Sequence, residues 1–216
     1  MSDATPHLKL SSGLTIGYRD PLAKADEAIT LDSGTHFLLA RNGRGKTTLL
    51  RTISRSLKQL DGSVEVSGRL QYVPEDMQFD AEIPVSSIFR AMLPKDRLKA
   101  AKELAERIEL DLKKPYAKLS TGNRRKTSLI IAEYSLDPTK SNILLLDEPF
   151  SGLDAHARAA FEQIWKLNAD KTLRLVSCHP DYDSMAMPSA LLIQDGSIRH
   201  TRGSDQTWSQ LKGRLN

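Results

Sequence analysis

The feature that most constrains the fold is an apolar segment followed at once by a glycine-rich turn. Residues 36–39 suit a buried strand, and the turn at residues 42–45 (Asn-Gly-Arg-Gly) leads directly into Lys46 and Thr47. Glycines let a backbone approach an anion closely, and the N-terminus of a helix attracts negative charge. Lys46 is then placed to reach the β- and γ-phosphates of a nucleotide, and the Thr47 hydroxyl to face Mg²⁺. The segment predicts a phosphate-binding loop between a strand and a helix.

A second segment supports this interpretation over a simpler one. The triad Gly45-Lys46-Thr47 also fits an ordinary strand-to-helix turn, because Ala40 stands where the full phosphate-loop pattern has its first glycine. However, the apolar residues 143–146 lead into Asp147 and Glu148, so a buried strand would carry both acids to the same sheet edge. There we expect Asp147 in the Mg²⁺ shell and Glu148 to polarise the attacking water. Strand alternation predicts that the two acids point in opposite directions.

The order of secondary-structure signals predicts an α/β fold. Short strand patterns occupy residues 8–40, helical periodicity dominates residues 84–135, and strand and helix alternate from residue 143 onward. We therefore expect a mixed sheet with an N-terminal antiparallel β-subdomain and an inserted α-helical subdomain.

The expected organisation is a single domain over residues 1–216. Its catalytic core and β-subdomain are assigned to residues 1–83 and 136–216, and its helical part to residues 84–135. The expected helices of the core are residues 46 to about 57, 155–168 and 181–187.

Composition excludes several classes of protein. Cys178 is the single cysteine and no Cys/His cluster has zinc-binding spacing, so we expect a reducing, cytoplasmic setting. No charged-then-apolar leader opens the sequence, and its apolar stretches are far shorter than the roughly 20 residues of a membrane span. The net charge of +4 is spread over mixed acids and bases, with only 6% aromatic residues, which does not favour a nucleic-acid surface. Any membrane association is expected to come through a partner.

Further segments, in a fixed order, resemble motifs of the ATP-binding domains of ABC transporters. Residues 119–123 (Leu-Ser-Thr-Gly-Asn) resemble the signature that opens a helix in that family. Residues 151–154 resemble the D-loop after the acidic strand, and His179 resembles the switch histidine after the next strand. Asp195-Gly196 resembles the turn that closes the family's core. The resemblance extends from about residue 8 to 205.

The resemblance implies a P-loop NTPase of the ABC type that binds ATP with Mg²⁺ and hydrolyses the ATP. In this family two domains pair head to tail, and each ATP lies between one phosphate loop and the partner's signature. The implied catalytic residues are Lys46, Glu148 and His179, and the implied metal contacts are Thr47, Asp147 and Glu75. The implied nucleotide contacts are Tyr18 (stacked on adenine), Asn42, Gly43, Arg44, Gly45, Lys46, Thr47, Thr48, Ser120, Thr121, Gly122 and Asp154, the last of which is expected to couple the two sites.

The sequence departs from the family pattern in three motifs. In the phosphate loop, Ala40 would be strained if the turn required a positive φ there, while the loop's two arginines add positive charge. In the signature, Thr121 replaces the first glycine, as in ATPase subunits of ABC-2-type exporters. In the Q-loop, Glu75 stands in the place of glutamine; we expect it to bind Mg²⁺ more strongly, or to repel Glu148 when metal is absent.

We expect an ATPase subunit that is peripheral on the cytoplasmic face of the cell membrane and that powers a separate transmembrane subunit docked near Glu75. One alternative is a soluble ABC-type ATPase acting on nucleic acid or the ribosome, but such families carry long coiled-coil insertions or tandem ATPase domains. A small-molecule P-loop kinase is the other alternative, and it would leave the signature, the D-loop and the switch histidine unexplained.

Overall fold

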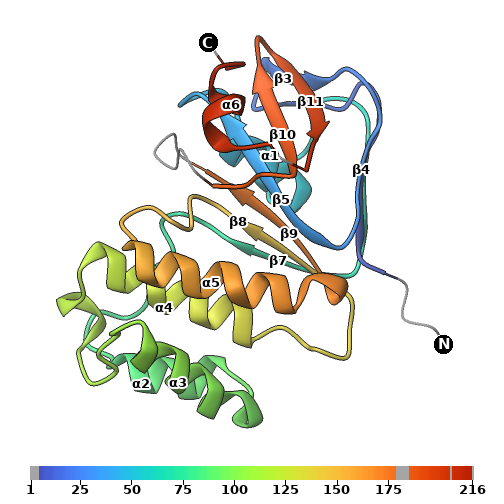
Figure 1. Ribbon diagram of the computed structural model, residues 1–216. Helices are drawn as coiled ribbons and strands as arrows, with labels where there is room; N and C mark the ends of the chain where they lie inside the picture. The colour runs from blue at the N-terminus through green and yellow to red at the C-terminus, as the bar shows by residue number, and fades with distance from the viewer. Residues whose placement is uncertain (1–4, 179–184, 205, 216) are drawn as a thin grey trace.

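The computed structural model describes residues 5–178, 185–204 and 206–215 and has an α/β architecture (Figure 1). The strands are β1 (His7–Leu10), β2 (Thr15–Gly17), β3 (Pro21–Ala25), β4 (Ile29–Leu31), β5 (Gly34–Ala40), β6 (Val64–Ser67), β7 (Arg69–Val73), β8 (Asn142–Leu146), β9 (Thr172–Ser177), β10 (Ser189–Gln194) and β11 (Ser197–Arg202). The helices are α1 (Lys46–Ile53), α2 (Val85–Met92), α3 (Leu98–Arg107), α4 (Thr121–Tyr134), α5 (Ala155–Leu167) and α6 (Trp208–Lys212), with 3₁₀ turns at Lys95–Arg97, Tyr116–Lys118 and Ala169–Lys171.

Within the described residues, the strands form an eight-stranded mixed sheet and a three-stranded antiparallel sheet. The large sheet has the order β2-β3-β11-β10-β5-β9-β8-β7, and neighbours from β10 to β7 are parallel. The small sheet has the order β4-β1-β6. This mixed sheet with a separate N-terminal antiparallel sheet confirms the expected fold class. Because the central strands are parallel, β5, β7, β8 and β9 all end at one edge of the sheet.

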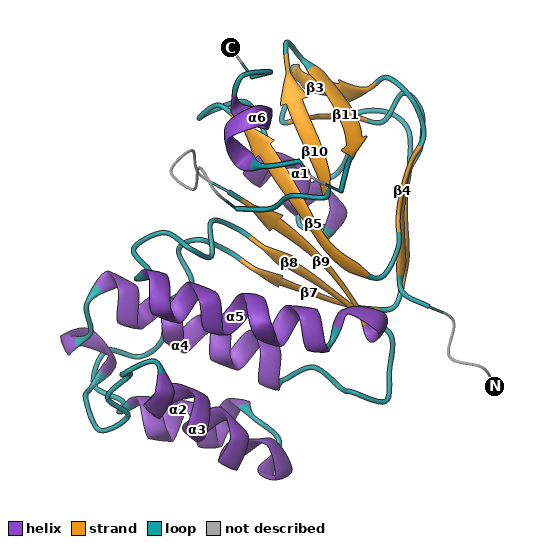
Figure 2. Ribbon diagram, in the orientation of Figure 1, coloured by secondary structure: helices purple, strands orange, loops and turns teal. Residues whose placement is uncertain are grey.

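The central strand β8 is apolar from Ile143 to Leu146 because both faces of the sheet are covered. All five residues of β8 are buried, and its four apolar side chains alternate between two hydrophobic clusters. Leu144 and Leu146 pack toward α4 and α5, whereas Ile143 and Leu145 pack toward α1 and the small sheet. Figure 2 shows α4 and α5 beside β7–β9, with α2 and α3 beyond them. The alternation of buried side chains therefore holds helices on both sides of one sheet.

Every regular element between residues 85 and 134 is helical, as the periodicity predicts. These helices share one hydrophobic cluster with α5 and the central strands, including Phe89, Leu104 and Ile130. The helical segment is therefore packed onto the α/β core and has no separate core of its own. Among the described residues, none of the helices combines the length and hydrophobicity that a membrane span requires.

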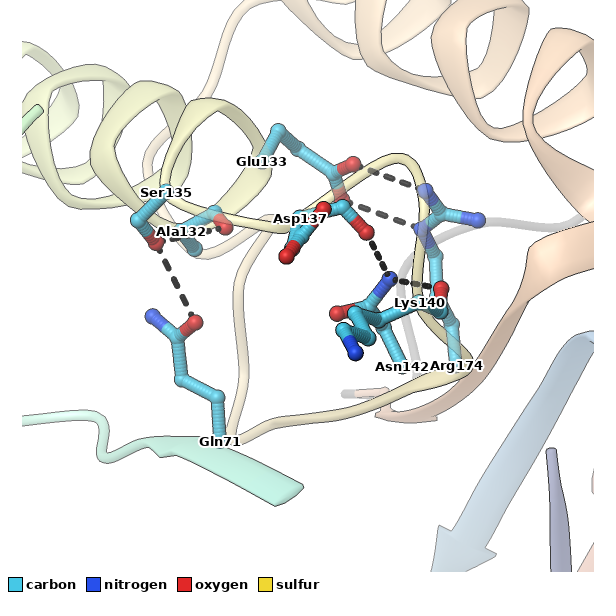
Figure 3. Close-up of polar contacts among 8 residues, drawn as sticks. All are labelled: Gln71, Ala132, Glu133, Ser135, Asp137, Lys140, Asn142 and Arg174. Atoms are coloured by element: carbon cyan, nitrogen blue, oxygen red, sulfur yellow. Dashed lines mark hydrogen bonds and ion pairs between the residues drawn. The ribbon is translucent and has the colours of Figure 1, made fainter. Parts of the chain in front are cut away.

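A buried ion pair fixes the end of α4 to the sheet (Figure 3). The Nε and Nη2 atoms of Arg174 on β9 donate to the two carboxylate oxygens of Glu133 at 3.0 and 2.8 Å. Arg174 is completely buried and its Nη1 has no hydrogen-bond partner. A paired charge at this depth ties the signature-bearing helix to the central sheet, because neither residue can be buried alone without a large desolvation cost.

Some element boundaries differ from expectation. The prediction that α1 runs to about Leu57 is wrong: α1 ends at Ile53, because Arg55 adopts a left-handed conformation with φ 63° and turns the chain. The sequence pattern does not predict β3, β7, β11 or α6, which are short or carry polar residues at alternate positions. Of the helix expected at 181–187, residues 181–184 lie outside the described residues, and residues 185–187 are non-helical, with Ala186 in a bridge to Thr207.

Candidate active site

The expected phosphate loop lies between β5 and α1, at the edge where the parallel strands end. Gly43 and Gly45 have φ angles of 74° and 111°, values that side-chain-bearing residues rarely adopt. No side chain caps α1, so the backbone N–H groups of its first turn point toward the loop without intrahelical partners. Conformation and helix direction together form an anion-binding cradle.

Ala40 causes no strain in this loop. It is the last residue of β5, pairs with Ile193 of β10, and is not among the residues with positive φ. The position therefore needs no glycine. Its carbonyl oxygen instead accepts a hydrogen bond of 3.3 Å from Nζ of Lys46.

A cavity of about 610 Å³ opens over the cradle. It is lined by Arg41, Asn42, Gly43, Gly45, Lys46, Thr47, Thr48, Glu75, Glu148 and Ser151. Most of the residues expected to touch a triphosphate therefore lie together. Arg44 is exposed and does not line the cavity, so of the loop's two arginines only Arg41 faces it. Ser151 of the D-loop also lines the cavity, although the D-loop resemblance assigned no nucleotide contact to it.

Lys46 and Glu148 form an ion pair inside this cavity. Nζ of Lys46 lies 3.2 Å from Oε1 of Glu148, and the two side chains are only 8% and 11% exposed. Glu148 lies two residues past the end of β8 and has a φ of 47°, so strand alternation does not set its direction. The left-handed turn directs Glu148 toward Lys46 of the phosphate loop. The prediction that strand alternation alone separates the directions of Asp147 and Glu148 is therefore wrong.

Asp147 is held by two hydroxyl groups from neighbouring strands. Ser177 at the end of β9 donates to Oδ1 at 2.8 Å, and Tyr72 of β7 donates to Oδ2 at 3.2 Å. Ser177 also accepts a hydrogen bond of 2.8 Å from the backbone N–H of Glu148. Burial, together with the nearby Asp147 charge, raises the pKa of Tyr72 to about 12, so its hydroxyl remains a donor. No motif identifies Ser177 or Tyr72; their positions at strand ends are the only signal.

A second cavity of about 340 Å³ shares Thr47 and Glu75 with the first and also contains Asp147. The three residues expected to contact metal therefore line one space. One hydroxyl and two carboxylates suit Mg²⁺, which prefers oxygen ligands and takes its remaining ones from phosphate and water. Oε1 of Glu75 lies 3.5 Å from Nη2 of Arg125, a residue of the signature helix α4. Arg125 compensates the charge that Glu75 adds to the site.

Tyr18 lies outside the cavity over the cradle. Its side chain is 62% exposed, and its hydroxyl accepts a hydrogen bond of 3.2 Å from Nη1 of Arg51 on α1. The β2–β3 region nevertheless borders the loop, because a Cβ built on Gly45 would lie 3.1 Å from Leu22. An exposed aromatic ring at this position is available for stacking.

The signature residues Ser120, Thr121 and Gly122 do not line the phosphate cavity. Ser120 is the N-cap of α4 and accepts a hydrogen bond from the N–H of Asn123. A Cβ on Gly122 would lie 2.4 Å from the carbonyl oxygen of Gly152, so this glycine is needed for packing within the chain itself. The contact links the signature directly to the D-loop.

Asp154 strengthens the same link. Its Oδ1 caps α5 by accepting from the N–H of Ala157 at 2.7 Å, and its Oδ2 lies 2.8 Å from Nζ of Lys126 on α4. Hydrogen bonding to Lys126, then to the Ala157 amide, holds the pKa of Asp154 below its ordinary value. His179, the expected switch histidine, lies outside the described residues.

Comparisons with known proteins point to one family. The model of the family described as ABC transporter matches residues 28–151. The chain is 29% identical over 202 residues to the ABC transporter ATP-binding protein YtrB of Bacillus subtilis, covering 84% of this chain and 67% of that protein. It is 34% identical over 145 residues to the cytochrome c biogenesis ATP-binding export protein CcmA of Zymomonas mobilis, covering 65% of this chain and 61% of the relative. A solved structure of a putative ABC transporter ATP-binding protein from Pyrococcus furiosus is similar with a TM-score of 0.65 and 26% identity, covering 80% of this chain and 91% of that one.

Proposed function

The chain belongs to the ABC transporter family, and on that premise we propose that it is the ATP-binding and ATP-hydrolysing subunit of a transporter, of the compact export type that Thr121 favours. The observation that carries this proposal is the convergence of Lys46, Asp147 and Glu148 at one sheet edge beside an anion-binding cradle. The alternative of an ATPase acting on nucleic acid has no comparable support in the composition or in the names of the relatives reported above.

The residues of the site divide the chemistry between them. The cradle N–H groups and Lys46 hold the phosphates and stabilise the charge that develops during transfer. Glu148 orients the attacking water and accepts its proton. Thr47, Asp147 and Glu75 are the proposed contacts of Mg²⁺, which supplies charge neutralisation at the β- and γ-phosphates when bound.

We propose that a second ATPase domain completes the site. Ser120 and Gly122 are expected to contact the γ-phosphate, yet they do not line the cavity of their own chain. A head-to-tail pair would place the N-terminal end of α4 from one domain over the phosphate loop of the other. His179 is proposed to contact the same phosphate, and Tyr18 the adenine.

The transmembrane subunit is proposed to dock between the helical segment at residues 84–135 and the core at residues 1–83 and 136–216, close to Glu75. The Glu75–Arg125 ion pair connects these two parts beside the cavity. The protein would then be peripheral on the cytoplasmic face of the membrane, held there by its partner.

Two experiments test this function. Purified protein is expected to hydrolyse ATP only with Mg²⁺, and affinity purification from the membrane fraction is expected to recover a multi-span protein. Absence of nucleotide hydrolysis in the presence of that partner would refute the enzyme assignment. Recovery of RNA or DNA in place of a membrane protein would refute the transport assignment.

A further inference from the structure

Two residues that no motif identifies, Arg51 and Tyr72, lie between Tyr18 and the proposed metal site. Arg51 donates to the Tyr18 hydroxyl at 3.2 Å and lines the cavity of about 340 Å³ together with Tyr72. Tyr72 in turn donates to Oδ2 of Asp147 at 3.2 Å. The two hydrogen bonds and the shared cavity therefore extend from the exposed Tyr18 ring, just after β2, to the buried Asp147 carboxylate, just after β8.

Secondary structure explains why these side chains meet. Arg51 lies one helical turn after Thr47 on α1, so both side chains lie on the same face of that helix. On β7 the side chains alternate: Gln71 faces α4, where Ser135 donates to its Oε1 at 3.2 Å (Figure 3), and Tyr72 faces the opposite side. Arg51, Tyr72 and Asp147 all line the cavity of about 340 Å³ that also contains Thr47.

The contacts leave Asp147 in a defined orientation. Ser177 fixes Oδ1 and Tyr72 fixes Oδ2, so the carboxylate cannot rotate without breaking a hydrogen bond. Partners that orient a metal-binding carboxylate in this way typically change metal affinity when removed. Of these two partners, only Tyr72 lines the same cavity as Arg51, the residue that donates to Tyr18.

We propose that Tyr72 is a positioning residue of the ATPase, which orients Asp147 for the metal, and that Arg51 couples this orientation to Tyr18. This inference rests on the proposed function. Contact of the nucleotide base with Tyr18 would restrain Arg51 and thereby favour the metal-binding orientation of Asp147. The metal site would therefore respond to the base as well as to the phosphates.

The first test measures Mn²⁺ binding by electron paramagnetic resonance, with Mn²⁺ in place of Mg²⁺ and a non-hydrolysable ATP analogue present. Tyr72→Phe keeps the ring and removes only the hydroxyl; it is expected to weaken Mn²⁺ binding about tenfold. Binding of the analogue in EDTA is expected to stay unchanged, since the phosphate loop is intact. The control is Tyr134→Phe, which removes the hydroxyl of another half-buried tyrosine that lines neither cavity.

Equal Mn²⁺ affinities for Tyr72→Phe and the control would overturn the positioning role. A loss of analogue binding in EDTA would also overturn it, because the effect would then be structural. Failure of the proposed function would give a different result, because the parent protein itself would then neither bind the analogue nor hydrolyse Mg²⁺-ATP.

The second test concerns the coupling. Tyr18→Phe keeps the ring for stacking and removes the acceptor of Arg51, so it is expected to weaken Mn²⁺ binding about twofold or more in the parent. In the Tyr72→Phe background the same substitution is expected to have no effect, because the connection is already broken. An equal effect in both backgrounds, or none in either, would overturn the coupling.

Discussion

Nζ of Lys46 lies 3.2 Å from Oε1 of Glu148, within the cavity that covers the phosphate loop. The two charges neutralise each other where neither is well solvated. A phosphate bound at the loop must compete with Glu148 for Lys46, so phosphate binding and release of the carboxylate are linked. The same ion pair thus connects the residue proposed to hold the phosphate to the residue proposed to activate water.

Gly122→Ala is expected to damage both stability and turnover. The added Cβ would lie 2.4 Å from the carbonyl oxygen of Gly152, so α4 and the D-loop must separate. We expect a loss of about 1–3 kcal/mol in the free energy of unfolding, measured in urea, and a decrease in ATPase rate of about tenfold or more. Gly213→Ala is the control, because its Cβ would lie 3.6 Å from the nearest atom. Equal behaviour of the two variants would contradict the packing role.

Because Arg174 and Glu133 form a buried ion pair, we expect substitutions of the two residues to have non-additive effects on the free energy of unfolding. Arg174→Leu leaves a buried carboxylate without its cation, and we expect it to cost about 3–5 kcal/mol in the free energy of unfolding. Combining it with Glu133→Leu removes both charges from the buried site and is expected to restore most of that stability. Urea denaturation of the parent, both single variants and the double variant measures the effect. A double variant less stable than Arg174→Leu would show that the pair is not the cause.

The sequence predicts those parts of the site that depend on strand ends and on motifs. Lys46, Thr47, Asp147 and Glu148 meet because parallel strands end at one edge, which the order of apolar segments already indicates. Ser177 and Tyr72 could not be predicted, because single hydroxyl groups carry no pattern and act through contacts between distant strands. Likewise, nothing local shows that Gly122 packs on Gly152, since that contact depends on how α4 meets the D-loop.

Glu75→Gln is expected to change the metal requirement of the ATPase but not the stability of the protein. The Glu75 side chain is 56% exposed, so its ion pair with Arg125 contributes little to folding. Loss of one carboxylate is expected to raise the Mg²⁺ concentration for half-maximal activity by up to about tenfold. The comparison is Asp76→Asn, a neighbouring acid in the same cavity that is not assigned to the metal. Identical Mg²⁺ curves for Glu75→Gln and the parent would exclude Glu75 from the metal site.

We expect the free energy of unfolding to decrease in mild acid because of His36 and His200. Burial, then the charges of Arg202 and His36, lowers the pKa of His200 to about 4, and burial also lowers the pKa of His36. Between about pH 4 and the ordinary value of 6.5 the unfolded chain binds more protons than the folded one. The stability that the two neutral histidines contribute is therefore fully present above pH 6.5 and is lost as the pH falls toward 4. His200→Asn is expected to flatten this decline in melting temperature, and an unchanged slope would contradict it.

The central claim is that Glu148 activates water for hydrolysis of ATP bound at the Lys46 loop. Its most direct test is Glu148→Gln, assayed for ATP binding and for steady-state turnover with Mg²⁺. Because the amide no longer competes as an anion for Lys46, ATP is expected to bind at least as tightly as in the parent, while turnover falls by about a hundredfold or more. Turnover equal to that of the parent, with ATP bound, would contradict the account.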